Sequence, residues 1–198
     1  MKKIAFLLIV LPMLLADNGE AQNGRRRPVR NLSLHYLGID KSPEGLELYR
    51  QEAKKFHRRA KGMGLEKVQA TVTMQDPVTV DQALEILETY GLKPRFLYAF
   101  GDKNGQTVTY GYSFTSTHRE RATAMARRNA MDRDFMGIVS IITAVPVAQL
   151  PALQNDSRIF LVDLVADENF TYNQGNGQYM HHLAWDLHEN KKKALKGR

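Results

Sequence analysis

Cysteine is absent from all 198 residues of the chain. The protein therefore forms no disulfide and has no thiol nucleophile, no zinc–thiolate site and no cysteine for a lipid anchor. Small exported proteins often depend on disulfides, so a hydrophobic core has to stabilise this one. Hydrophobic residues make up 43% and charged residues 25% of the chain, which is the composition of an ordinary globular protein long enough to bury such a core.

Catalytic motifs are also scarce in the sequence, which has no Gly-rich phosphate loop, no nucleophile elbow and no His-Glu-x-x-His spacing. The densest group of candidate ligands is His181, His182 and His188, with Asp186 and Glu189. On a helix, His182 and Asp186 share one face and could hold a metal ion. A basic tail beside them repels cations, so we expect a docked amphipathic helix, with no catalytic residue, no metal and no cofactor.

Only one long apolar run occurs, over residues 4–16, and two lysines precede it. Small residues follow at Gly19 and Ala21. This pattern predicts a signal peptide over residues 1–21, because the run is short for a membrane span. We therefore expect an exported protein, periplasmic or extracellular. An uncleaved, membrane-anchored form stays open as an alternative.

Acidic residues are outnumbered, and the formal net charge is +7. The excess lies in four clusters, at 25–30, 54–61, 119–128 and 191–198. Such clusters suit nucleic acid, anionic lipid or an acidic protein. Export argues against nucleic acid, membrane contact is expected only if the signal segment stays uncleaved, and solvated faces remain the simplest interpretation.

The first half of the chain predicts a helix, a strand, a helix and a hairpin. Ser42 and Pro43 are a helix start, and residues 66–75 alternate as a strand with one buried and one polar face. Thr79 and Gln82 predict a capping box at the next helix. The hairpin strands carry aromatic residues that could form one ligand platform, although cross-strand packing explains them as well; these are Tyr98, Tyr110, Tyr112 and Phe114.

The second half predicts a helix over 117–135, a central strand over 138–145, a short helix over 147–153 and a last strand over 158–165. Two strand–helix–strand units in series predict an α+β, ferredoxin-like two-layer sandwich (βαβ-βαβ), with helices on one side of an antiparallel sheet. An inserted hairpin strand and helix separate the halves, and N-terminal and C-terminal helices flank them. The predicted parts after the signal peptide are a basic linker or arm (22–41), the sandwich domain (42–165), and a polar linker with a basic C-terminal helix and frayed end (166–198).

Residues 138–165 combine an apolar strand, a leucine-bearing helix, an Asp156-x-Arg158 turn and a strand that ends in Val162-Asp163. This combination resembles the second half of subtilisin-propeptide-like inhibitor domains. The resemblance implies that the tail after the last strand lies across a protease active site. That tail is Leu164, Val165, Ala166, Asp167 and Glu168.

The leading hypothesis is an exported, non-enzymatic protein-binding module that uses its sheet or its tail. Its partner would be another extracytoplasmic protein, a protease being one candidate, and its role inhibitor or chaperone. Besides residues 164–168, Trp185 is a candidate partner-binding residue, on a helix over 179–189 that docks on the domain or on a partner. Two alternatives are a membrane-anchored sensor or regulator domain, and a metal-dependent hydrolase that uses the C-terminal histidines.

Overall fold

The computed structural model describes residues 40–114, 119–164, 167 and 182–196. The predicted signal peptide and most of the predicted arm lie outside these residues. Among the helices described, none is long and apolar enough to cross a membrane.

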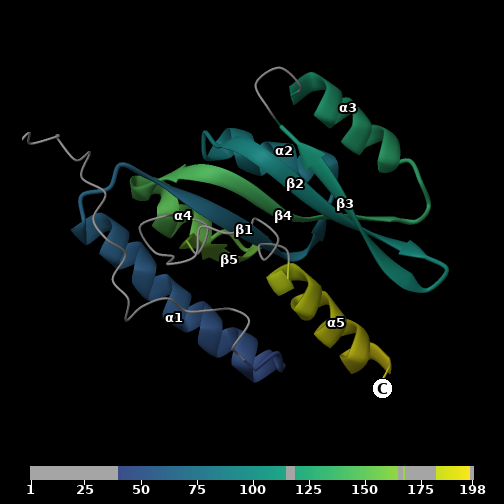
Figure 1. The fold of residues 1–198 in the computed structure, drawn as a ribbon, viewed down its shortest axis with the longest axis horizontal. Coiled ribbons are helices and arrows are strands. Elements are labelled where there is room, and N and C mark those ends of the chain that lie inside the picture. The colour runs from purple at the N-terminus through teal and green to yellow at the C-terminus, as the bar shows by residue number, and fades with distance from the viewer. Residues whose placement is uncertain (1–39, 115–118, 165–166, 168–181, 197–198) are drawn as a thin grey trace, which may run out of the picture.

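The described chain is an α+β fold built on a five-stranded antiparallel sheet (Figure 1). The strands lie in the order β3-β2-β4-β1-β5. Their bounds are β1 (Lys67–Val78), β2 (Lys93–Lys103), β3 (Gln106–Ser113), β4 (Phe135–Pro146) and β5 (Ile159–Asp163). The helices are α1 (Pro43–Gly62), α2 (Val80–Thr89), α3 (Arg119–Asn129), α4 (Leu150–Gln154), preceded by a 3-10 turn η3 (Val147–Gln149), and α5 (His182–Lys196).

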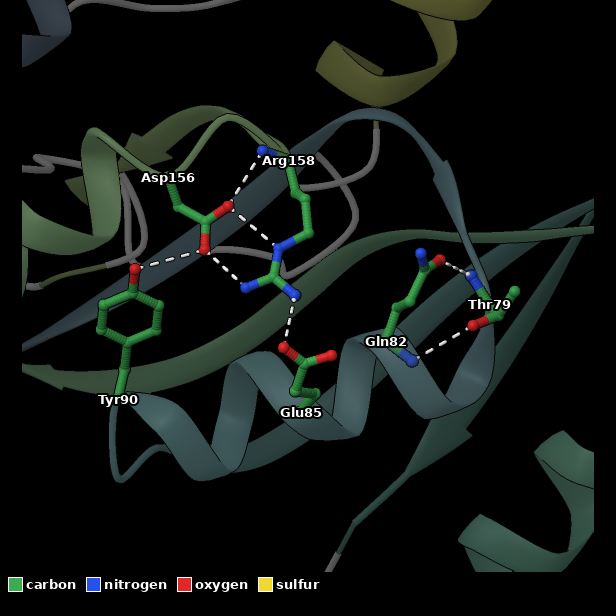
Figure 2. Close-up of polar contacts among 6 residues, drawn as sticks. All are labelled: Thr79, Gln82, Glu85, Tyr90, Asp156 and Arg158. Atoms are coloured by element: carbon green, nitrogen blue, oxygen red, sulfur yellow. Dashed lines mark hydrogen bonds and ion pairs between the residues drawn. The ribbon is translucent and has the colours of Figure 1, made fainter.

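Local sequence signals account for several of these boundaries. The Ser42 hydroxyl accepts a hydrogen bond from the Gly45 N–H (3.1 Å) and caps α1. Thr79 and Gln82 form the predicted capping box of α2, with distances of 3.1 and 2.9 Å (Figure 2). Asn104 and Gly105 both have positive φ, 56° and 80°, as a two-residue hairpin turn between β2 and β3 requires.

One face of the sheet carries the main core, as predicted. The apolar residues of the alternating β1 pattern point to this face, together with the central strand β4. Helices α2, α3 and α4 cover it, and Figure 1 shows α2 and α3 above the sheet. Buried members from the strands include Val68, Ala70, Val72, Leu97, Ala99, Ile141 and Val145; those from α3 are Ala122 and Ala126. The inserted helix is therefore docked, over 119–129, and its predicted cap at residue 117 lies outside the described residues.

The second face of the sheet is covered too, although α2 and α4, the helices of the two predicted strand–helix–strand units, share the first face. Thr71 and Thr73, expected on a polar face, are 5% and 0% exposed. Helices α1 and α5 lie on this side (Figure 1), where Leu46 of α1 and Leu183 of α5 share one apolar cluster. The alternation in β1 predicts which side chains share a face, but the small, half-apolar threonines do not reveal that other elements cover them.

Helix α5 docks on its own domain and continues through residues predicted to fray. Ala184 is 4% exposed, and the Trp185 ring packs edge-on against Phe100, with centroids 5.6 Å apart. The ammonium group of Lys191 donates to the Gln75 carbonyl and to Asp76. These contacts anchor the C-terminal half of the helix, so Lys191 ties α5 to β1.

This packing predicts that Leu183→Ala lowers the free energy of unfolding by about 2–5 kcal/mol, because the substitution opens a cavity between α5 and the sheet. Leu195→Ala is the matched control on the same helix, since Leu195 is 72% exposed. Urea unfolding followed by Trp185 fluorescence measures both. Equal stabilities of the two variants would contradict the docking of α5.

Candidate protein-binding edge

The sheet has two edge strands, β5 and β3. An edge strand presents unpaired backbone N–H and C=O groups that can pair with another chain, and most proteins protect such edges. The two edges of this sheet differ sharply, and the difference locates the candidate site.

Side chains satisfy the outer edge of β5. The carboxamide of Gln154, 6% exposed, donates to the Phe160 carbonyl (3.2 Å) and accepts from the Val162 N–H (2.9 Å). It therefore makes the two bonds that a neighbouring strand would make. On α1, His57 Nε2 donates to the Val162 carbonyl (2.6 Å). Burial lowers the pKa of His57, which favours the neutral ring, and the hydrogen bond to Val162 opposes this shift in part.

The chain just after β5 also serves its own domain. Leu164 is 1% exposed in the main core. The Asp167 carboxylate, 5% exposed, accepts from the Gln69 N–H of β1 (2.7 Å). Two residues of the predicted partner-binding tail are thus packed against the sheet. The other three, Val165, Ala166 and Glu168, lie outside the described residues.

No described segment of the chain pairs with the outer edge of β3. The Phe114 N–H donates to the Arg95 carbonyl (2.8 Å), so Arg95 and Phe114 are a hydrogen-bonded pair of the β2–β3 ladder. Because hydrogen-bonded and non-hydrogen-bonded pairs alternate, every second residue of β3 directs its backbone groups away from β2. These residues are Thr107, Thr109, Gly111 and Ser113. Among the described residues, no hydrogen bond reaches their backbone groups.

Within the part of the chain that the structure describes, β3 carries none of the usual protections of an edge strand. Residues 106–113 include no proline and no charged side chain. The β2–β3 ladder runs without a register shift, so no bulge interrupts it. Thr109, Gly111 and Ser113 are exposed. Such a strand offers a template on which an extended segment can form main-chain hydrogen bonds.

A groove of about 510 Å³ lies at the hairpin end of β3, between the turn and α5. Trp185, half-buried, forms part of its wall. Lys192 Nζ donates to the Thr107 hydroxyl (2.9 Å) and ties α5 to the edge strand. The groove is lined by Gly105, Gln106, Thr107, Trp185, Glu189, Lys192 and Lys193. Of the predicted site residues that the structure describes, Leu164, Asp167 and Trp185, only Trp185 lies beside this edge.

The predicted aromatic platform is divided between the two faces of the hairpin. Tyr110 and Tyr112 pack toward the main core, as does Phe114 after the strand. Tyr98 pairs with Gly111 in the ladder and lies on the opposite face, in the cluster of Phe100. The interpretation of these four side chains as one platform is therefore wrong. Side chains alternate between the two faces along a strand, and Tyr98 lies opposite Gly111, whose position falls between Tyr110 and Tyr112 and so faces the other way.

The Asp156-x-Arg158 turn, which carried the family resemblance, forms an internal ion pair (Figure 2). Arg158 donates to both carboxylate oxygens of Asp156 (3.0 and 2.7 Å) and to Glu85 of α2 (3.2 Å). The Tyr90 hydroxyl donates to the same carboxylate of Asp156 (3.2 Å). The hydrogen bonds from Arg158 hold the pKa of Asp156 below its usual range. The motif therefore ties α2 to the turn before β5.

The C-terminal histidines do not meet as a group in the part of the chain that the structure describes. His188 lies against the Phe100 ring (5.4 Å between centroids), and burial lowers its pKa, with Lys192 adding to the effect. The carboxylate of Asp186 forms an ion pair with the ammonium group of Lys41, with Oδ2 3.9 Å from Nζ. His181 and the side chain of His182 are outside the described parts. Within those parts, no three His, Asp or Glu side chains are arranged as a metal site.

No protein-family model, no curated protein and no solved structure matches this chain.

The capped edge predicts that Gln154→Ala lowers the free energy of unfolding by about 2–4 kcal/mol, because one buried donor and one buried acceptor lose their partners. Gln149→Ala, at an exposed position in η3, is the matched control and should change the free energy of unfolding by under about 0.5 kcal/mol. Chemical denaturation measures both. If Gln154→Ala is as stable as the control, the capping account of β5 is wrong.

Proposed function

We propose that this protein is an exported, non-enzymatic protein-binding module that binds an extended segment of another extracytoplasmic protein. The segment adds to the sheet as a sixth strand along β3. One observation carries the proposal: the β5 edge is closed by buried side chains, whereas the β3 edge is regular, uncharged and exposed. Main-chain hydrogen bonds would give affinity, and neighbouring side chains would give specificity.

The strand order supports a ferredoxin-like interpretation of the domain. Without β3, the sheet reads β2-β4-β1-β5, and two strand–helix–strand units supply these four strands. The inserted β3 then adds a fifth strand outside β2. In this interpretation the insertion replaces one edge of the sandwich with a strand suited to pairing.

The sheet is better supported than the tail as the binding surface. An inhibitor that acts through residues 164–168 would have to withdraw Leu164 from the core and Asp167 from its bond to β1. Strand addition at β3 needs no such rearrangement. A protease remains one candidate partner, and the sensor and hydrolase hypotheses gain no supporting observation.

Export is proposed from the N-terminal sequence and has a direct test. N-terminal sequencing of the protein from the extracytoplasmic fraction should begin near Gln22. A start at Met1 would instead favour the membrane-anchored alternative.

Strand addition predicts that Thr109→Pro abolishes partner binding. The Thr109 N–H points away from β2, so proline removes an outward donor and breaks no bond of the β2–β3 ladder. Thr109→Val is the control, since it keeps the N–H and suits a strand. The two variants and the wild-type protein are immobilised and exposed to the extracytoplasmic fraction, and the captured proteins are compared by mass spectrometry.

Proteins that wild type and Thr109→Val retain should be lost from Thr109→Pro. Thermal unfolding checks that the proline variant is folded, and Gly111→Pro provides a second disruption of the same edge. Retention of the same proteins by both proline variants would contradict binding at β3.

A further inference from the structure

We infer that the segment recognised by β3 is acidic, with its carboxylates at the end that lies over the groove beside α5. This inference rests on the proposed strand addition and specifies the chemistry of the partner.

The charges around the open edge are basic at both ends. At the hairpin end, Lys103 and Lys193 are exposed and have no acidic partner among the described residues. Two acids lie at the same end and offset part of this charge: Asp102, which accepts from the Gly105 N–H (2.7 Å), and Glu189, whose carboxylate lies 4.0 Å from Lys192 Nζ. Three lysines, Lys103, Lys192 and Lys193, outnumber them.

At the other end of β3, the neighbouring helix α3 begins with basic side chains. Arg119 and Arg121 are exposed there, with Glu120 between them in sequence. Since β3 itself is uncharged, an added segment meets an excess of basic over acidic side chains at each end and neutral backbone between. Electrostatic complementarity therefore favours carboxylates in the partner.

A second copy of this chain fits the edge poorly. Two β3 strands paired antiparallel would place the Lys103 and Lys193 end of one copy beside the Arg119 and Arg121 end of the other. Like charges placed opposite each other across an interface disfavour pairing. The same excess of basic side chains that attracts an acidic segment thus discourages self-association through β3.

The groove also limits which side chains the recognised segment can carry. On the α5 side, β3 presents only small side chains, at Thr107, Thr109, Gly111 and Ser113, which leaves room for larger side chains on that face of an added strand. Trp185 offers an apolar wall next to Lys192 and Lys193. The recognised segment therefore combines a β-forming stretch with Asp or Glu at one end.

The probe is a displayed library of random peptides about twelve residues long, selected on the purified full chain. Selected peptides should combine β-branched residues with terminal acidic residues. The variant Lys192→Glu/Lys193→Glu should bind the selected peptides about tenfold more weakly. The reason is that two ion pairs between these lysines and the peptide carboxylates are lost and replaced by repulsion. This variant should also select basic peptides instead. Arg58→Glu/Lys61→Glu, on the exposed side of α1, makes the same change in net charge and should behave as wild type.

Fluorescence anisotropy of labelled peptides measures their binding and distinguishes failure of the acidic preference from failure of strand addition. Selection of peptides without acidic residues, or equal binding by both charge-reversal variants, would overturn the acidic preference while leaving strand addition intact if Thr109→Pro still abolishes binding. Peptides that bind Thr109→Pro as tightly as wild type would instead overturn strand addition itself. A concentration-dependent dimer that Thr109→Pro dissociates would show that a second copy occupies the edge, contrary to the inference.

Discussion

An antiparallel sheet of five strands ends in two rows of backbone N–H and C=O groups, and these groups need partners in the protein, in water or in another chain. Here β5 lies between α1 and α4, so His57 and Gln154 can reach its outer groups. At the other end of the sheet, α3 and α5 contact the two faces of the β2–β3 hairpin but leave the outer backbone of β3 exposed.

Coverage of both faces of the sheet limits how a partner can be recognised. The main core occupies one face, and on the other α5 covers Phe100 of β2 through contacts such as that of Trp185. The exposed apolar side chains beside β3 are few; Phe96 of β2, opposite Ser113, is 36% exposed, and Trp185 forms part of the groove wall. Main-chain pairing would therefore supply the affinity of the edge, and the surrounding lysines and arginines would supply selectivity and steering.

Local patterns predicted the elements, whereas contacts between distant segments were not predictable. The caps at Ser42 and Thr79 fixed the starts of α1 and α2, and a continuous apolar run identified β4. The burial of Thr73 depends on tertiary packing, because the alternation of β1 placed this residue on the polar face. The capping by Gln154 also depends on tertiary packing, and Gln154 lies in no periodic pattern. The open edge did have a signal that was missed, since residues 106–113 lack the charges and proline that usually protect an edge strand.

Hydrogen exchange of individual backbone amides tests the asymmetry of the two edges most directly. We expect fast exchange at Thr109 and Gly111, whose N–H groups point outward from β3, and slow exchange at their neighbour Tyr110, which pairs with β2. On the other edge, Val162 should exchange slowly because Gln154 accepts its N–H. If Thr109 and Gly111 exchange as slowly as Tyr110 in the isolated protein, their amides are already bonded and β3 is not an open edge.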